Sequence, residues 1–179
     1  DAQQAPTVLG LADGGFVVTW HSFDQDGSGV GVYGQRFTAT GLKVGVEFRV
    51  NTTTALIQEA PTGALLDDGG FVVLFENEPV AGQGFEVRGQ RFDADGAAVG
   101  GEFVVRDKAG ATQRWPDVTA LENGGFVATW VSFASDGSGT SLELRVFDDR
   151  DDPTVYRLNQ VTAGSQDQVK VTTLADGSF

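Results

Sequence analysis

The sequence has no cysteine, no methionine and a single histidine, His21. Without cysteine the chain can form no disulfide, no thiolate metal site and no cysteine nucleophile. One histidine and no cysteine also argue against a zinc site, and a Ser-His-Asp triad would have to use His21. Because His21 follows an apolar stretch that is predicted to be a buried strand, we interpret it as a structural residue. No apolar run approaches the roughly 20 residues of a transmembrane helix, so membrane insertion is not expected.

Positive charge is scarce as well. The chain has 12 Lys and Arg residues against 25 Asp and Glu residues, which gives a net charge of −13 and a pI of about 4.2. A surface of this sign repels phosphate backbones, so nucleic acid is not an expected partner. It favours cations, above all calcium, whose ligands are carboxylate and carbonyl oxygens. The alternative is that the negative charge only keeps the protein soluble.

What the sequence does contain is an internal repeat. A segment that begins Gly-Gly-Phe-Val occupies residues 14–20 and 69–75, and Gly-Gly-Phe-Val-Ala recurs at 124–130, each time 55 residues further on. A fourth copy begins at residues 176–179, where Phe179 stands 53 residues after Phe126. The repeat divides the chain into units at 1–55, 56–110 and 111–163, followed by the start of a fourth unit at 164–179.

Each unit is predicted to contain four strands. In the first unit they fall near residues 6–11, 16–20, 30–37 and 47–50, separated by Asp-Gly and Thr-Gly turn signals. We therefore predict an all-β fold of tandem four-stranded antiparallel sheets that resemble the blades of a β-propeller, each covering the apolar face of the next. An open stack of sheets or a β-solenoid array is the alternative.

The number of units bears on the partner. Propellers close with about four to eight blades, whereas this sequence has three full units. We expect either that the remainder of a longer chain completes the propeller or that copies of the chain associate with one another.

The repeat pattern also resembles a known family. Leu-Ala-Asp-Gly-Gly-Phe-Val-Val-Thr-Trp at 11–20, then Asp-Gly-Ser-Gly at 26–29 and Tyr-Gly-Gln-Arg-Phe at 33–37, is similar to tandem repeats of large, acidic, calcium-associated bacterial secreted proteins of the RTX type. The resemblance covers the whole chain and is strongest in the first two units. It implies type I export, a secreted or cell-surface location in bacteria, and no catalytic residue. The glycine-rich nonapeptides that bind calcium in RTX proteins are absent, so that role is not carried over.

Two acidic loops are candidate calcium sites. Asp24 and Asp26 precede Gly27, and Asp93 and Asp95 precede Gly96. Carboxylates two residues apart and followed by Gly resemble the start of a calcium loop. The second unit has no copy of the first motif, and the alternative is that each Asp-Gly pair serves the backbone geometry of a turn.

Two recurring glutamates are interpreted as structural. Glu47 and Glu102 occupy the same repeat position, next to predicted strands that carry Arg36 and Arg91. Carboxylate pairs can act as acid and base, but catalytic groups usually occur once, so we predict either structural ion pairs with these arginines or a solvated face.

Trp115 is the candidate ligand-binding residue. It replaces the alanines that stand at the same repeat position, Ala5 and Ala60, and an unpaired indole in a loop can stack on a sugar. Local packing at the rim is the alternative.

These observations favour a non-catalytic binding or structural module, such as an adhesin, matrix or surface-array segment, with carbohydrate or another cell-surface ligand as partner. The alternatives are part of a propeller-scaffold carbohydrate-active enzyme, glycosidase or lyase, and a self-assembling fibre subunit. The enzyme hypothesis predicts that Glu76, Glu78, Trp115 and Asp117 converge in one cleft.

Overall fold

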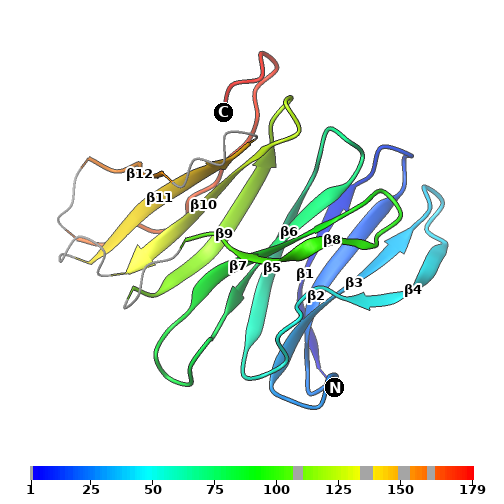
Figure 1. The fold of residues 1–179 in the computed structure, drawn as a ribbon, viewed down its shortest axis with the longest axis horizontal. Coiled ribbons are helices and arrows are strands. Elements are labelled where there is room, and N and C mark those ends of the chain that lie inside the picture. Colours follow the sequence, from blue (N-terminus) through cyan, green and yellow to red (C-terminus); the bar gives the residue numbers. More distant parts are fainter. Residues whose placement is uncertain (1, 107–110, 134–138, 149–153, 161–163) are drawn as a thin grey trace.

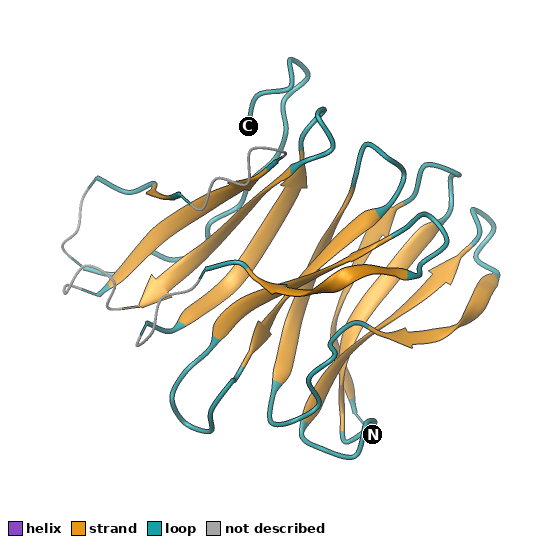
Figure 2. Cartoon of the chain, viewed as in Figure 1, coloured by secondary structure: helices purple, strands orange, loops and turns teal. Residues whose placement is uncertain are grey.

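The fold is all-β, as predicted. The computed structural model describes residues 2–106, 111–133, 139–148, 154–160 and 164–179, and these residues form three four-stranded antiparallel sheets (Figures 1 and 2). No helix long and apolar enough to cross a membrane is found among them.

The strands follow the chain in order. Sheet 1 contains β1 (Gln3–Gly10), β2 (Phe16–Phe23), β3 (Val30–Phe37) and β4 (Lys43–Arg49). Sheet 2 contains β5 (Gln58–Leu65), β6 (Phe71–Asn77), β7 (Glu86–Phe92) and β8 (Ala98–Val104). Sheet 3 contains β9 (Gln113–Ala120), β10 (Phe126–Phe133), β11 (Thr140–Phe147) and β12 (Val155–Arg157).

Each sheet is a simple meander, and the sheets lie side by side in sequence order (Figure 1). The first strands of neighbouring sheets contact one another, β1 with β5 and β5 with β9. We call β1, β5 and β9 the inner strands. The fourth strands, β4, β8 and β12, form the opposite edges of the sheets.

The same tight turn joins the first two strands of every sheet. In sheet 1 the Leu11 N–H donates to Gly15 O at 2.8 Å, and Asp13 Oδ1 accepts the Gly15 N–H at 2.8 Å. Gly14 has a φ of 81°, and a Cβ on Gly15 would lie 2.5 Å from the carbonyl oxygen of Phe37. The turn itself therefore accounts for the Asp side chain at position 13 and for the glycine at position 14. Equivalent bonds recur at Leu66–Gly70 with Asp68, Leu121–Gly125 with Asn123, and Leu174–Ser178 with Asp176.

The repeated phenylalanines occupy copies of one environment. Phe16 stacks on Phe37 with ring centroids 5.1 Å apart, and the two equivalent pairs stack at 4.9 Å and 4.5 Å. These pairs are Phe71 with Phe92 and Phe126 with Phe147. The prediction that each unit folds into its own sheet is confirmed by this equivalence.

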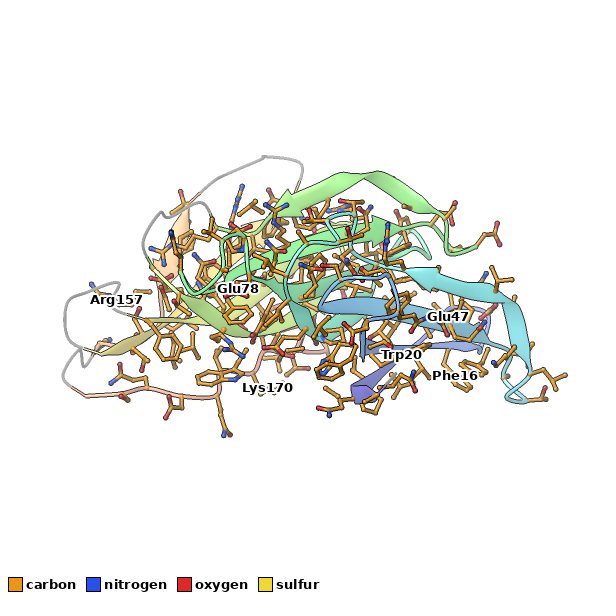
Figure 3. All side chains as sticks on the ribbon, turned by 90° about the horizontal axis from the view of Figure 1, so that it is seen from below. Phe16, Trp20, Glu47, Glu78, Arg157 and Lys170 are labelled. Carbon is orange, nitrogen blue, oxygen red and sulfur yellow. The ribbon has the colours of Figure 1, made fainter. Side chains whose placement is uncertain are left out.

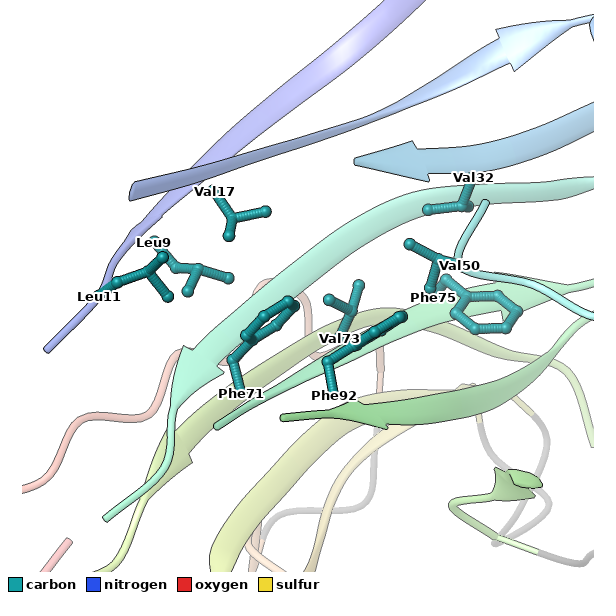
Figure 4. Close-up of a cluster of buried hydrophobic side chains, with 9 residues drawn as sticks. All are labelled: Leu9, Leu11, Val17, Val32, Val50, Phe71, Val73, Phe75 and Phe92. Atoms are coloured by element: carbon teal, nitrogen blue, oxygen red, sulfur yellow. The ribbon is translucent and has the colours of Figure 1, made fainter. Parts of the chain in front are cut away.

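Apolar side chains fill the space between successive sheets. Figure 4 shows the first of these cores, in which side chains of sheet 1 face the Phe71 side of sheet 2. Its members are Leu9, Leu11, Val17, Val32 and Val50 opposite Phe71, Val73, Phe75 and Phe92. The second core has the same plan, with Leu66, Val72, Leu74, Val87 and Val105 opposite Val118, Phe126, Ala128 and Trp130. Burying a side chain of this size contributes about 1.5–3 kcal/mol, so these two interfaces are the main source of stability.

A glycine in the third strand makes room for the aromatic ring of the fourth strand. A Cβ on Gly34 would lie 2.5 Å from the Phe48 ring, and a Cβ on Gly89 would lie 2.5 Å from the Phe103 ring. Phe48 in turn contacts Phe92 of the next sheet at 5.2 Å between centroids. The Tyr-Gly-Gln-Arg-Phe motif therefore encodes a contact between sheets as well as a strand.

The Phe16 face of sheet 1 is less covered than its copies. Phe71 and Phe126 are fully buried, whereas Phe16 and Trp20 are partly exposed beside an open depression of about 420 Å³. Figure 3 shows Phe16, Trp20 and Glu47 together at this end of the molecule.

Candidate functional site

Every inner strand contains a bulge at its start. The pairing register with the second strand jumps between Gln4 and Thr7 in β1, and the same irregularity interrupts β5 and β9. The residue at each bulge has a left-handed backbone: φ is 49° for Ala5, 51° for Ala60 and 55° for Trp115. Residues other than glycine disfavour this conformation, and bulges and strained residues of this kind gather at functional sites.

The three bulges line one groove, which we call the inner groove. Its volume is about 740 Å³, and the start of the fourth unit closes one side of it. The lining residues are Ala5, Pro6, Thr7, Ala60, Pro61, Thr62, Trp115, Pro116, Asp167, Gln168, Val169 and Lys170. Gln168 has a φ of 60°, so the left-handed position is present in the fourth unit too. Figure 3 places Lys170 well away from the Phe16 end of the molecule.

Trp115 supplies the aromatic wall of the inner groove. Its side chain is 44% exposed, and its ring lies 5.6 Å from Phe133 at an angle of 55°. The equivalent residues of sheets 1 and 2 are alanines, so of the three bulges only the one in β9 presents an indole to the groove. The indole is open to the inner groove, and ligand binding by Trp115 stays a prediction.

A buried ionic cluster lies directly behind Trp115. The Trp115 N–H donates to Glu76 Oε1 at 2.7 Å, and Arg114 Nε forms an ion pair with Glu76 Oε2. Arg114 Nη2 also donates to Glu59 Oε1 at 2.9 Å, and the guanidinium lies over the Phe85 ring at 4.1 Å. Glu59 and Glu76 stand directly opposite each other in the β5–β6 ladder.

Glu76 has no exposed surface, and this burial raises its pKa to about 7. The Trp115 N–H and the Arg114 guanidinium favour the charged form of Glu76 and act against the rise, whereas the charge of Glu59 adds to it. The cluster therefore contains one carboxyl group that changes protonation near neutral pH.

The corresponding contact between sheets 1 and 2 uses His21. His21 occupies the repeat position of Glu76, and its Nδ1 accepts the Ala60 N–H at 3.5 Å. Burial lowers the pKa of His21, while the nearby Glu59 carboxylate acts in the opposite direction. His21 is therefore a structural residue, as the sequence indicates.

The carboxyl groups behind the inner groove are engaged within the protein. Glu76 presents no surface to a bound molecule, and Glu59 is engaged by Arg114. An exposed indole beside polar backbone and Thr, Gln and Lys side chains suits a polyhydroxylated ligand. Within the described part of the chain, no three His, Asp or Glu side chains are grouped so as to hold a metal ion.

The four predicted calcium ligands lie outside the inner groove. Asp24, with a φ of 56°, and Asp26 belong to the β2–β3 loop, where Asp26 Oδ1 accepts the Ser28 N–H at 3.2 Å. Asp93 shapes the β7–β8 turn by accepting the N–H groups of Asp95 at 3.0 Å and Ala97 at 2.8 Å. Both loops have the turn geometry of the alternative interpretation, and calcium binding stays a prediction.

Of the four residues that the enzyme hypothesis requires in one cleft, two come together. Glu76 and Trp115 are hydrogen-bonded at the inner groove. Glu78 instead accepts the Gly82 N–H at 2.7 Å in the β6–β7 loop. Asp117 Oδ2 accepts the Val171 N–H at 2.9 Å and ties the fourth unit to β9.

The arginines predicted as partners of Glu47 and Glu102 are wrong, although Glu102 does form an ion pair and Glu47 lies on an exposed face. Glu102 pairs with Arg88 at 2.7 Å, and Glu47 accepts a hydrogen bond from the Gln25 side chain. Arg91 lies over the ring of Phe126 in the next sheet at 5.1 Å. Arg36 likewise reaches another sheet, donating to the backbone oxygen of Asp95 at 2.8 Å. The prediction considered only contacts inside one sheet, whereas these arginines connect sheets.

The interaction that sequence reasoning missed is the one between Glu76, Arg114 and Trp115. Arg114 stands where the other units have Gln4, Glu59 and Asp167, and this change of charge at a repeat position was the available signal. A departure from the repeat marked both Arg114 and Trp115.

Several solved structures share this fold. The endo-arabinase from Bacteroides thetaiotaomicron superposes with a TM-score of 0.58 and 18% identity, covering 82% of this chain and 56% of the enzyme. A Hadza microbial sialidase, Hz136, gives a TM-score of 0.62 and 13% identity over 92% of this chain and 39% of the enzyme. The α-L-arabinofuranosidase Arb93A from Fusarium graminearum gives 0.53 and 14%, over 79% and 45%.

These similarities establish the architecture: the three sheets resemble blades of the β-propellers of glycosidases. At such low identity they show the fold alone, and the chain spans 39% to 56% of the length of these enzymes. No protein-family model matches the chain, and no curated protein matches it in sequence.

Proposed function

We propose that the chain is a carbohydrate-recognition module and that the inner groove is its binding site. One observation carries the proposal: an exposed tryptophan in a left-handed bulge faces a groove of about 740 Å³ at the point where the other units have alanine. An indole presents a flat apolar face for a sugar ring, and the surrounding polar groups can bind hydroxyls. The names of the structurally similar proteins, an endo-arabinase, a sialidase and an arabinofuranosidase, support carbohydrate as the ligand class.

The test is a titration with arabinobiose, longer arabinan oligosaccharides and sialyllactose, followed by calorimetry or NMR, on the wild-type chain and on Trp115→Ala. Alanine is a well-matched replacement because Ala5 and Ala60 adopt nearly the same left-handed φ as Trp115. We expect the variant to fold normally and to lose affinity by about tenfold or more. Absence of binding to all these glycans, or equal affinity of Trp115→Ala and wild type, would contradict the proposal.

Glycoside hydrolysis is the second candidate function. The observation in its favour is the pair of carboxyl groups, Glu59 and Glu76, opposite each other in one ladder, with a Glu76 pKa of about 7 suited to a general acid. Against it, Arg114 engages both carboxylates and Glu76 is fully buried. Turnover of chromogenic arabinofuranosides or sialosides that Glu59→Gln abolishes would favour the enzyme; binding without turnover would favour the recognition module.

Secretion and display at the bacterial cell surface stay predictions of the repeat resemblance. They accord with a carbohydrate ligand, and protease accessibility of the protein on intact producing cells measures them directly.

A further inference from the structure

The bulge in each inner strand removes its residue from the sheet ladder, so the backbone N–H of that residue needs another acceptor. In β9 the pairing passes from Arg114 to Asp117, and Pro116 has no N–H to donate. The N–H of Trp115 is the one that must be satisfied. Its acceptor is a side chain of the preceding sheet, Glu76 of β6, at 2.7 Å.

The same arrangement recurs one repeat earlier with a weaker acceptor. The Ala60 N–H at the β5 bulge donates to His21 of β2 at 3.5 Å, a longer bond to a neutral nitrogen. In the third unit the repeat position of His21 and Glu76 is occupied by Val131 of β10, whose side chain has no hydrogen-bond acceptor. The side chain that accepts the bulge N–H therefore differs from unit to unit, whereas the bulge itself is conserved among the units. The strongest acceptor, Glu76, is the one that faces Trp115.

Glu76 is itself held in place from several directions. Arg114 of β9 pairs with its second oxygen and also binds Glu59, the carboxylate opposite Glu76, and Phe85 supports the guanidinium at 4.1 Å. Glu59 and Arg114 are the charged groups that face it from the neighbouring strands. A carboxylate with no exposed surface and two fixed partners cannot swing away, so its direction fixes the backbone of Trp115.

We infer that Glu76 is a positioning residue for ligand binding: by accepting the Trp115 N–H it holds the left-handed bulge that presents the indole to the inner groove. The inference rests on the proposed function in that Trp115 is taken as the sugar-stacking residue. The Glu76 contact acts through the backbone, so it sets the pose of the ring without touching the sugar.

The experiment compares three substitutions in the full chain by NMR and by titration with arabinobiose. Glu76→Val introduces the residue of the third unit and removes the acceptor, whereas Glu76→Gln keeps a carbonyl oxygen in its place. Glu102→Gln is the control, because Glu102 is also buried and paired with an arginine, Arg88, but lies in an outer strand. The backbone amide resonance of Trp115 reports the hydrogen bond directly, and it is identified in protein labelled with ¹⁵N at tryptophan alone by its absence from the Trp115→Ala spectrum.

We expect Glu76→Val to shift the Trp115 amide strongly upfield, to shorten its hydrogen-exchange lifetime, and to weaken arabinobiose binding about tenfold. Glu76→Gln should keep the amide downfield and hold affinity within about twofold of the wild type. Glu102→Gln should leave both quantities unchanged, whatever it does to stability.

An unchanged Trp115 amide in Glu76→Val would overturn the inference, as would a Glu76→Gln variant that loses as much affinity as Glu76→Val. If Trp115→Ala binds arabinobiose as well as wild type does, the proposed function fails instead, and the amide resonance still decides whether Glu76 holds the bulge. If Glu76→Val does not fold, Glu76→His decides, because His21 stands at this position in the first unit and makes a longer hydrogen bond of 3.5 Å. The Trp115 amide should then move upfield, and an unchanged amide would overturn the inference.

Discussion

The two interfaces between sheets have the same apolar core but different polar contacts at the inner strands. Between sheets 1 and 2, Phe48 packs 5.2 Å from Phe92; between sheets 2 and 3, Phe103 packs 5.5 Å from Phe147. Where the inner strands start, the first interface has a neutral histidine contact at 3.5 Å. The second has a carboxylate contact at 2.7 Å that is backed by Arg114.

This difference separates what the repeat must keep from what it can change. A ring that fills the space between sheets cannot be altered without a cavity, so Phe71 and Phe126 are identical. The side chain at the bulge points away from the core into the groove, so alanine and tryptophan are equally compatible with the packing of the sheets. Function in this architecture should therefore be sought where the units differ.

The largest expected effect tests whether the two cores are equivalent. Phe71→Ala and Phe126→Ala should each lower the free energy of unfolding by about 3–5 kcal/mol, because both rings are fully buried in stacked pairs. Phe16→Ala should cost about half as much, since that ring is partly exposed. Chemical denaturation at pH 7 measures all three. If Phe16→Ala costs as much as Phe71→Ala, another sheet covers that face in solution, and the mass in light scattering would show whether it comes from a second copy.

The second prediction separates the two interfaces by pH. The pKa of Glu76 is raised from 4.5 to about 7, so the stability that its protonated form contributes is complete below pH 4.5 and is lost as the pH rises to 7. Glu76→Gln does not titrate. Its free energy of unfolding relative to wild type should therefore rise across this window, by up to about 3 kcal/mol. Urea unfolding at pH 4.5, 5.5, 6.5 and 7.5 measures the change, and a constant difference would mean that buried Glu76 is ionised throughout.

The contribution of His21 to the free energy of unfolding should change with pH in the opposite direction. Its pKa is lowered by burial, so its contribution is present above pH 6.5 and is lost as the pH falls through the lower value of the folded protein. His21→Gln should remove this loss of stability at acidic pH, so its free energy of unfolding relative to wild type should rise as the pH falls in the same urea series. If His21→Gln and Glu76→Gln change with pH in the same direction, the two interfaces do not differ as described.

Glycine in the third strand gives the next effect. Gly89→Ala places a Cβ 2.5 Å from Phe103 and 2.7 Å from Leu74, and both neighbours are packed in the second core. We expect a loss of about 1–3 kcal/mol in thermal or chemical unfolding. The three atoms nearest to a Cβ on Gly34 all belong to the Phe48 ring, and no fully buried side chain such as Leu74 is among them, so Gly34→Ala should cost less. Equal losses would mean that the two outer strands are equally constrained.

The sequence predicts the repeating part of this molecule well and the site poorly, for a physical reason. Turns and stacked rings depend on residues close in the chain, so Asp13 with Gly15, or Phe16 with Phe37, follow from the pattern itself. The Glu76–Trp115 bond joins residues 39 apart in different sheets, and no periodicity encodes how one sheet is rotated against the next. The error in assigning Arg91 to Glu102 has the same cause.

Calcium is expected to have the smallest effect, and of the two candidate loops we expect the one with Asp24 and Asp26 to bind it more tightly than the one with Asp93 and Asp95. The Asp26 side chain is only 2% exposed and lies 4.0 Å from Arg49, whereas the Asp95 side chain is 97% exposed and lies 3.8 Å from Arg36. A preordered carboxylate loses less entropy on binding an ion than a mobile one, but Arg49 competes for it, so we expect a millimolar dissociation constant. Calcium at about ten times that constant would add about 1.4 kcal/mol to the free energy of unfolding and raise the melting temperature by a few degrees.

The calcium-induced shift in melting temperature should vanish in Asp26→Ala and persist in Asp95→Asn. Because the quantity compared is the calcium-induced shift, a general loss of stability in either variant does not affect the result, and a shift that survives in Asp26→Ala would exclude this loop as the binding site.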